Sequence, residues 1–117
     1  GAGARLSETT DFSWRDNNLS WYKPFTHQHL GEILQSLEGL QGERPDLLFL
    51  PLRGNFSRGI FATAYTNFDG SLQQAIALYR TFYQDARFTF LTDTPPALKQ
   101  VVNTNAAHLH LHKQAVD

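Results

Sequence analysis

The sequence predicts a mixed α/β domain with a sheet of about four strands and two to three helices. Three observations support this class. Apolar or β-branched runs of strand length alternate with segments of helical periodicity, and glycine, proline or asparagine stands at the junctions. Strands that alternate with helices favour right-handed crossovers and a mostly parallel sheet. At 117 residues the chain has the size of one domain with one hydrophobic core.

Residues 1–25 form an aromatic-rich arm ahead of the regular elements. Its large aromatic side chains are Phe12, Trp14, Trp21, Tyr22 and Phe25. Such side chains pack against protein rather than remain in water. We therefore divide the chain into an arm, 1–25, and a single α/β domain, 26–117. Because the chain contains no methionine and starts with Gly1-Ala-Gly, we expect the domain to be excised from a longer protein.

The first regular elements are a helix and two strands. Leucine and isoleucine recur with helical spacing over residues 27–39, and Gly39 and Gly42 are the expected stop signals. An apolar run at 46–52 and a β-branched, aromatic run at 60–66 have the length of strands. Their connection is too short for a parallel crossover, so the two strands are predicted to form an antiparallel hairpin.

The second half continues the alternation. A helix over 72–85 presents one apolar stripe, and a strand follows at 87–92. Thr94 and Pro95 then introduce a short third helix, and the last strand covers 107–113. If the aromatic arm adds a strand before the first helix, an α+β ferredoxin-like sandwich becomes the alternative architecture.

Three histidines stand at alternate positions near the C-terminus, in the sequence HLHLH. In a strand, His108, His110 and His112 share one face. Neutral imidazole is a common zinc ligand, so this face can hold a divalent metal. The alternative is a strand whose leucines are buried and whose histidines are solvated. His27 and His29 fall on opposite sides of the first predicted helix, so they are not expected to face one ion together.

Two groups of loop residues suit a small ligand. Guanidinium groups and exposed backbone N–H groups between the first two strands can bind an anion. Polar side chains after the second and third strands would lie at the carboxyl edge of a parallel sheet, where ligands bind. The candidate ligand-binding residues are Arg53, Asn55, Arg58, Asn67, Asp69 and Asp93. The alternative is that these residues belong to solvated loops and helix caps, with Asp69 or Ser71 and Thr94 as the caps.

The charge balance and the composition exclude several classes of function. Ten Lys and Arg stand against eleven Asp and Glu, which leaves no basic surface for nucleic acid or an anionic membrane. The apolar run Leu47–Leu52 is too short to span a bilayer, so we expect no membrane insertion. Cysteine is absent, which removes disulfides, zinc-thiolate sites and cysteine nucleophiles. The absence of cysteine fits either a reducing or an oxidising cellular compartment.

The sequence therefore favours a non-catalytic sensory, regulatory or adaptor domain. It would bind a protein partner, a neighbouring domain of the parent chain, or a small anionic ligand, and no catalytic residue is identified. The alternative is a metal-dependent or anion-binding enzyme module that uses the face of His108, His110 and His112. A divalent metal is the one cofactor that this alternative requires.

Overall fold

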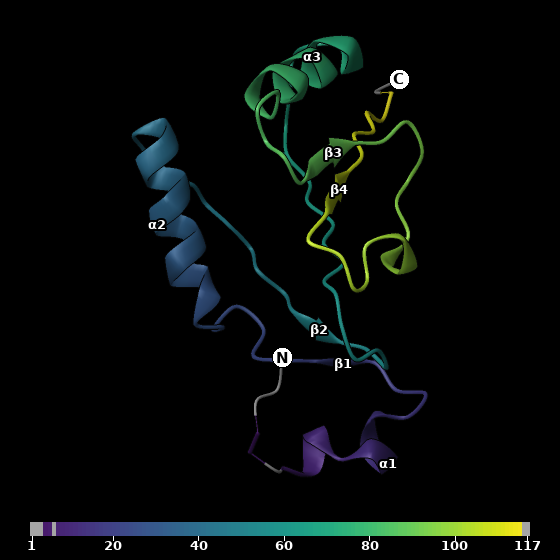
Figure 1. Cartoon of the computed structure of the whole chain (residues 1–117). Helices are drawn as coiled ribbons and strands as arrows, with labels where there is room; N and C mark the ends of the chain where they lie inside the picture. The colour runs from purple at the N-terminus through teal and green to yellow at the C-terminus, as the bar shows by residue number, and fades with distance from the viewer. Residues whose placement is uncertain (1–3, 6, 116–117) are drawn as a thin grey trace. The chain divides into compact units, whose positions relative to one another are not determined.

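The computed structural model describes residues 4–5 and 7–115 and divides the chain into two compact units, Gly1–Phe56 and Ser57–Asp117 (Figure 1). Helices and strands occur in both units, so the mixed α/β class is confirmed. The four strands form two sheets of two strands each, rather than one sheet of four. The division at residue 25 stays a prediction.

The first unit is built around an antiparallel pair of strands. Its elements, in chain order, are η1 (Glu8–Thr10), α1 (Phe12–Arg15), β1 (Ser20–Trp21), α2 (His29–Gln41) and β2 (Leu52–Arg53). Ser20 pairs with Arg53 and Trp21 with Leu52. Two more backbone bonds, Tyr22 N to Pro51 O and Phe25 N to Phe49 O, both 3.0 Å, continue the pairing beyond the regular strands. The aromatic arm thus contributes a strand.

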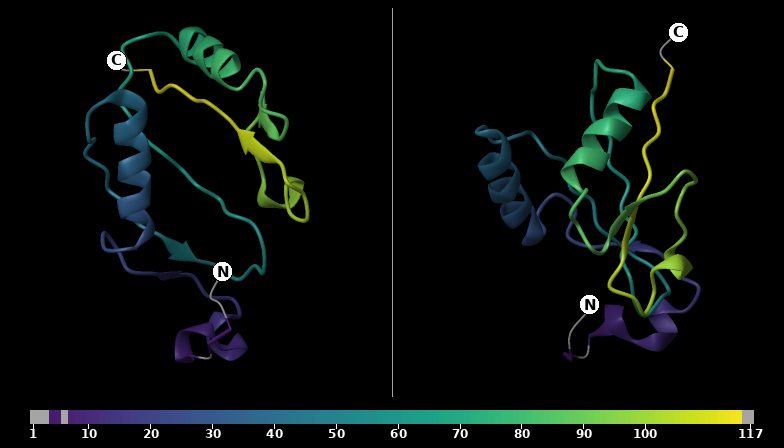
Figure 2. Two further views of the ribbon diagram at one scale, coloured as in Figure 1. Left: turned by 60° about the vertical axis from the view of Figure 1, so that its left-hand side comes forward. Right: turned by 45° about the horizontal axis from the view of Figure 1, so that its top comes forward.

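The predicted hairpin between 46–52 and 60–66 is wrong. The first of these segments pairs with β1 of the arm, and residues 57–70 run without helix or strand (Figure 2). A β-branched sequence has strand propensity, but a strand exists only where another strand accepts its hydrogen bonds. Segment 60–66 has no such partner among the described residues.

Helix α2 ends two residues later than predicted, at Gln41. Gly39 lies inside the helix, and the chain leaves it at Gly42, whose φ of 82° is left-handed and whose N–H donates to Glu38 O at 2.8 Å. Both glycines match the stop signal in sequence. Only the second takes the positive φ that a glycine accepts without a steric cost.

The second unit contains α3 (Leu72–Phe82), β3 (Thr89–Leu91), η2 (Leu98–Gln100) and β4 (Ala107–Leu109). The two strands are parallel, as the alternation predicted, with Thr89 opposite Ala107 and Leu91 opposite Leu109. Their adjacency argues against the ferredoxin-like alternative, in which another strand separates the strands of a βαβ unit. The short third helix is a single 3₁₀ turn with Ala97 at its N-cap, so the cap predicted at Thr94 is wrong.

Ser71 caps α3, as one of the two sequence alternatives predicted. Its hydroxyl accepts from Gln74 N–H at 3.1 Å, and Gln74 Oε1 accepts from Ser71 N–H at 2.7 Å. We expect Ser71→Ala to lower the free energy of unfolding by about 1 kcal/mol, because the first turn loses a partner for its N–H groups. Urea unfolding measures this. Ser36→Ala is the control. The Ser36 hydroxyl donates to Glu32 O within α2, and its loss should be neutral or slightly stabilising. Equal effects of the two substitutions on the free energy of unfolding would contradict the assignment of the cap.

The hydrophobic core that the chain length predicted is not formed within the described residues. No hydrophobic side chain there is buried, and Ile60, Tyr65 and Leu48 are 88%, 93% and 86% exposed. The apolar residues that sequence analysis assigned to a core therefore need cover from elsewhere. None of the helices described here is long and apolar enough to cross a membrane.

Candidate functional site

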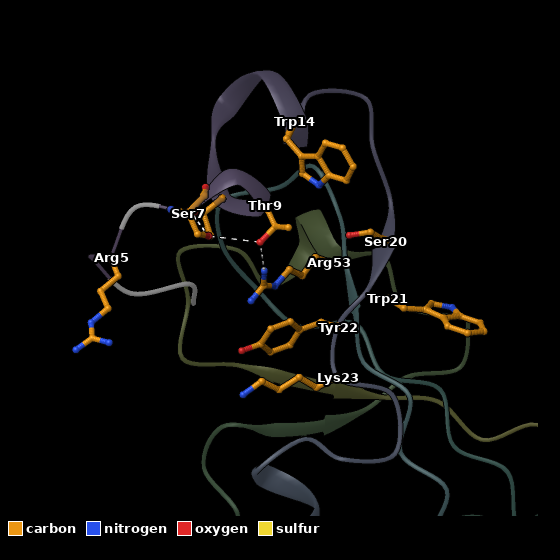
Figure 3. Close-up of a pocket in the computed structure, with 10 residues that line it drawn as sticks. Arg5, Ser7, Thr9, Trp14, Ser20, Trp21, Tyr22, Lys23 and Arg53 are labelled. Atoms are coloured by element: carbon orange, nitrogen blue, oxygen red, sulfur yellow. Dashed lines mark hydrogen bonds between the residues drawn. The ribbon is translucent and has the colours of Figure 1, made fainter.

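A cavity of about 440 Å³ lies beside β1 in the first unit (Figure 3). Most of its lining side chains are cationic, hydroxylated or aromatic. They are Arg5, Ser7, Thr9, Thr10, Trp14, Ser20, Trp21, Tyr22, Lys23 and Arg53. None of them is acidic, so cations face this space without a compensating carboxylate in its wall. The volume falls within the range of small-molecule sites.

The guanidinium of Arg53 is fixed between two lining residues. Its carbon lies 3.5 Å from the centroid of the Tyr22 ring, and its Nη1 donates to Thr9 Oγ1 at 3.3 Å. The strand register explains the stack, because Arg53 is opposite Ser20 and Tyr22 follows two positions later on the same face. Figure 3 shows the guanidinium between the Thr9 hydroxyl and the Tyr22 ring, whereas Trp21 points away from it.

A hydroxyl cluster forms the wall next to η1. Thr10 Oγ1 accepts from Ser7 N–H at 3.0 Å and lies 3.0 Å from Ser7 Oγ, which is 3.4 Å from Thr9 Oγ1. The 3₁₀ turn brings these positions together because residues three apart stand above one another in it. Each hydroxyl can donate or accept, so the wall can adapt to a ligand of either polarity.

His27 lies next to this cavity wall, against the Tyr22 ring. The two ring centroids are 5.2 Å apart and edge-on, and His27 Nδ1 accepts from His29 N–H at 3.1 Å. Partial burial lowers the pKa of His27, and repulsion from His29, Lys23 and Arg53 lowers it further. His27 is therefore neutral near pH 7, with a hydrogen-bond acceptor already engaged.

The predicted separation of His27 and His29 is wrong. Their ring centroids are 4.6 Å apart, because α2 begins at His29 and His27 precedes it in a turn. The angle of an ideal helix does not apply to a residue outside the helix. Sequence analysis missed the contact between Tyr22, His27 and Arg53 because strand pairing between distant segments creates it.

The predicted anion loop is only partly present. Arg53 lines the cavity, but Asn55 Nδ2 donates to Asp16 Oδ1 at 3.2 Å and so ties two turns of the first unit together. Arg58 belongs to the second unit. Three predicted ligand residues, Asn67, Asp69 and Asp93, also lie in that unit. Their role in binding stays a prediction, although the strand expected to bring Asn67 and Asp69 to a sheet edge is not formed.

The alternating histidines do not form one solvated face. Regular strand β4 ends at Leu109; His108 and His110 are as half-buried as Leu109 and Leu111, while His112 is exposed. The His108 ring lies edge-on to Phe90 at 6.0 Å and its Nδ1 has no described partner, whereas His110 Nδ1 is 2.9 Å from Thr92 O. Within residues 4–5 and 7–115, no three His, Cys, Asp or Glu side chains are grouped to hold a metal ion. A metal held by these histidines stays a prediction.

Comparison with known proteins gives consistent matches over nearly the whole chain. Residues 1–117 match the family described as "Semialdehyde dehydrogenase, dimerisation domain". A relative from Christiangramia forsetii is 60% identical over 97% of this chain and 36% of its own length. Relatives from Parabacteroides distasonis and Flavobacterium johnsoniae are each 54% identical over 97% of this chain and 35% of theirs. All three carry the name N-acetyl-gamma-glutamyl-phosphate reductase, and the chain spans about a third of their length.

These matches correct the functional prediction. A non-catalytic sensory, regulatory or adaptor role conflicts with relatives that are reductases, and so does a regulatory ligand-binding domain. The metal-dependent alternative centred on the terminal histidines is not supported either. The expected protein partner is confirmed in general terms, because the matching family is described by dimerisation. The sequence shows no sign of a relation to reductases, because no nucleophile or cofactor motif is evident in this chain.

Proposed function

The chain belongs to the family of semialdehyde dehydrogenase dimerisation domains, and from this membership we propose that it is the dimerising part of a reductase that acts on N-acetyl-γ-glutamyl phosphate. The observation that carries the proposal is 60% identity over 97% of the chain to a relative with that name. At such identity, changes concentrate in loops and on surfaces while the fold and its contacts persist. The small anionic ligand expected from the sequence is then the substrate.

The chemistry of such a reductase places demands on the protein. An acyl phosphate is reduced when a hydride adds to its carbonyl carbon and the C–O bond to phosphate breaks, which leaves an aldehyde and free phosphate. The hydride donor supplies both electrons, and the phosphate leaves as an anion. Substrate and product are therefore anionic, and cationic side chains such as those in the cavity wall suit them.

Dimerisation accounts for the uncovered apolar surface. Ile60 and Tyr65 are almost fully exposed in the single chain, and an apolar surface of this extent is typical of a permanent interface. A second chain, or a neighbouring domain, would remove such side chains from water. The dimer is thus proposed to complete the fold as well as to assemble the enzyme.

Purified full-length protein that contains this chain tests the proposal. Offered N-acetyl-γ-glutamyl phosphate and reduced nicotinamide nucleotides as hydride donors, it is expected to oxidise the donor and release one phosphate per hydride transferred. N-acetylglutamate, which has no phosphate to leave, is the control substrate and should give no reaction. If the donor is not oxidised with the acyl phosphate, or is oxidised equally with the control, the proposal is overturned.

A further inference from the structure

We propose that the cavity beside β1 is a phosphate-binding site in which Arg53 is the principal donor. The inference extends the proposed function, which names a substrate but no residue that holds its phosphate. The phosphate group belongs either to the acyl phosphate substrate or to free inorganic phosphate. Both present the same tetrahedral oxygens and the same negative charge to the cavity wall.

The wall of the cavity is positively charged. Arg5, Lys23 and Arg53 line the cavity, and no carboxylate shares the wall with them. The described salt bridge of the first unit, between Arg44 and Glu38 at 3.8 Å, lies outside the cavity. Elsewhere in the described structure, cations are solvated or bond to backbone carbonyls, as Lys113 does with Phe68 O at 2.7 Å. A positive cavity without a compensating carboxylate attracts an anion.

The principal donor, Arg53, is preorganised. Stacking on Tyr22 and the bond to Thr9 Oγ1 hold the Arg53 guanidinium in one orientation before any ligand arrives. A guanidinium has five N–H groups in a planar fork, and Arg53 uses one of them in a hydrogen bond within the described structure. The remaining donors can bind two oxygens of one phosphate, which a lysine ammonium cannot do with the same geometry.

Hydroxyl groups form another part of the cavity wall. Ser7 and Thr9 present hydroxyl groups to the space that Arg53 faces, and Ser20 presents another from β1 (Figure 3). Hydroxyls donate to phosphate oxygens without adding charge, so they would complete the coordination of an anion whose charge the cationic side chains of the wall balance. The indole of Trp14 also lines the cavity.

Calorimetric titration of the full-length protein with inorganic phosphate tests the site. We expect Arg53→Lys to weaken phosphate binding at least tenfold, because charge remains but the fork is lost. Arg44→Lys is the matched control: the same substitution at an exposed arginine of the same unit, which should leave the affinity within twofold. No binding by the unaltered protein, or equal binding by the two variants, overturns the inference.

A second variant guards against misfolding of the first. Lys23→Gln removes a second cation of the wall, whose ammonium lies 5.6 Å from the Tyr22 centroid, and keeps both Arg53 and Tyr22. It is expected to weaken phosphate binding several-fold, with an unchanged melting temperature; full affinity in this variant would also count against the site. Inhibition kinetics then identify the source of the phosphate. Phosphate that raises KM for the acyl phosphate without changing kcat occupies the substrate's own site, whereas inhibition of kcat alone indicates a site for free phosphate. Because titration needs no turnover, an inactive protein that binds phosphate would refute the proposed function and leave this site standing.

Discussion

Diluting the protein from about 100 μM to about 1 μM is expected to lower its melting temperature by roughly 5 °C. The shift follows from mass action. A hundredfold dilution lowers the free energy of unfolding of a dimer by about 2.7 kcal/mol. Division by the large entropy with which two chains of this length unfold together gives the shift in melting temperature. The structural reason is the absence of buried hydrophobic side chains in the described part of a single chain. Circular dichroism melts at several concentrations measure the effect.

Two further observations sharpen this test. Sedimentation velocity over the same concentrations should show the dimer dissociate where the melting temperature begins to fall. Lysozyme or another monomeric protein, melted in parallel, supplies the concentration-independent control. If the melting temperature stays constant while the protein sediments as a monomer, the exposed side chains do not require a partner chain.

Replacing Gly59 by valine is expected to destabilise the protein by about 2–3 kcal/mol. Gly59 has a φ of 93°, a backbone conformation that β-branched residues rarely adopt. A Cβ atom there would also lie 2.6 Å from Leu98 Cδ1 and 3.5 Å from Val102 Cγ2. The leucine tip can rotate away, so most of the cost comes from the backbone. Thermal unfolding of the variant measures it.

Gly39→Ala is the paired control, with the opposite expected sign. Gly39 lies inside α2, and a Cβ atom there would meet nothing within 4 Å. Alanine restricts the unfolded chain and favours the helix, so we expect a gain of about 0.5–1 kcal/mol. A Gly59 variant that melts with the unaltered protein, or a Gly39 variant that melts below it, would show that these backbone conformations are not the ones the protein uses.

Local signals in the sequence predicted most of what is local in the fold. The helix over 72–85 and the parallel strands after it follow from periodicity and from the capping serine, and the structure has α3, β3 and β4 within those ranges. The end of α2 was misplaced because two glycines match the same signal and the backbone uses one of them. Residue propensity identifies the glycines that could end a helix, and the backbone conformation of the folded chain decides which of them does.

Contacts between distant segments could not be predicted in the same way. The pairing of β1 with β2 joins the aromatic arm to the apolar run, and the cavity exists because of that pairing. Arg53 was a candidate on grounds of charge alone, while its stack on Tyr22 depends on register. The missing core was equally inaccessible, because a pattern of apolar residues does not reveal whether the covering surface belongs to the same chain.

The β1–β2 ladder also bears on how related chains can vary. It joins the two walls of the cavity directly, so the long connection that contains α2 need only bring the strand ends together. The entropy of closing such a loop grows with the logarithm of its length, and doubling the length costs only about 0.6 kcal/mol. Insertions or deletions around α2 can therefore accumulate in homologous chains while the register of Ser20 with Arg53, and with it the cavity, stays the same.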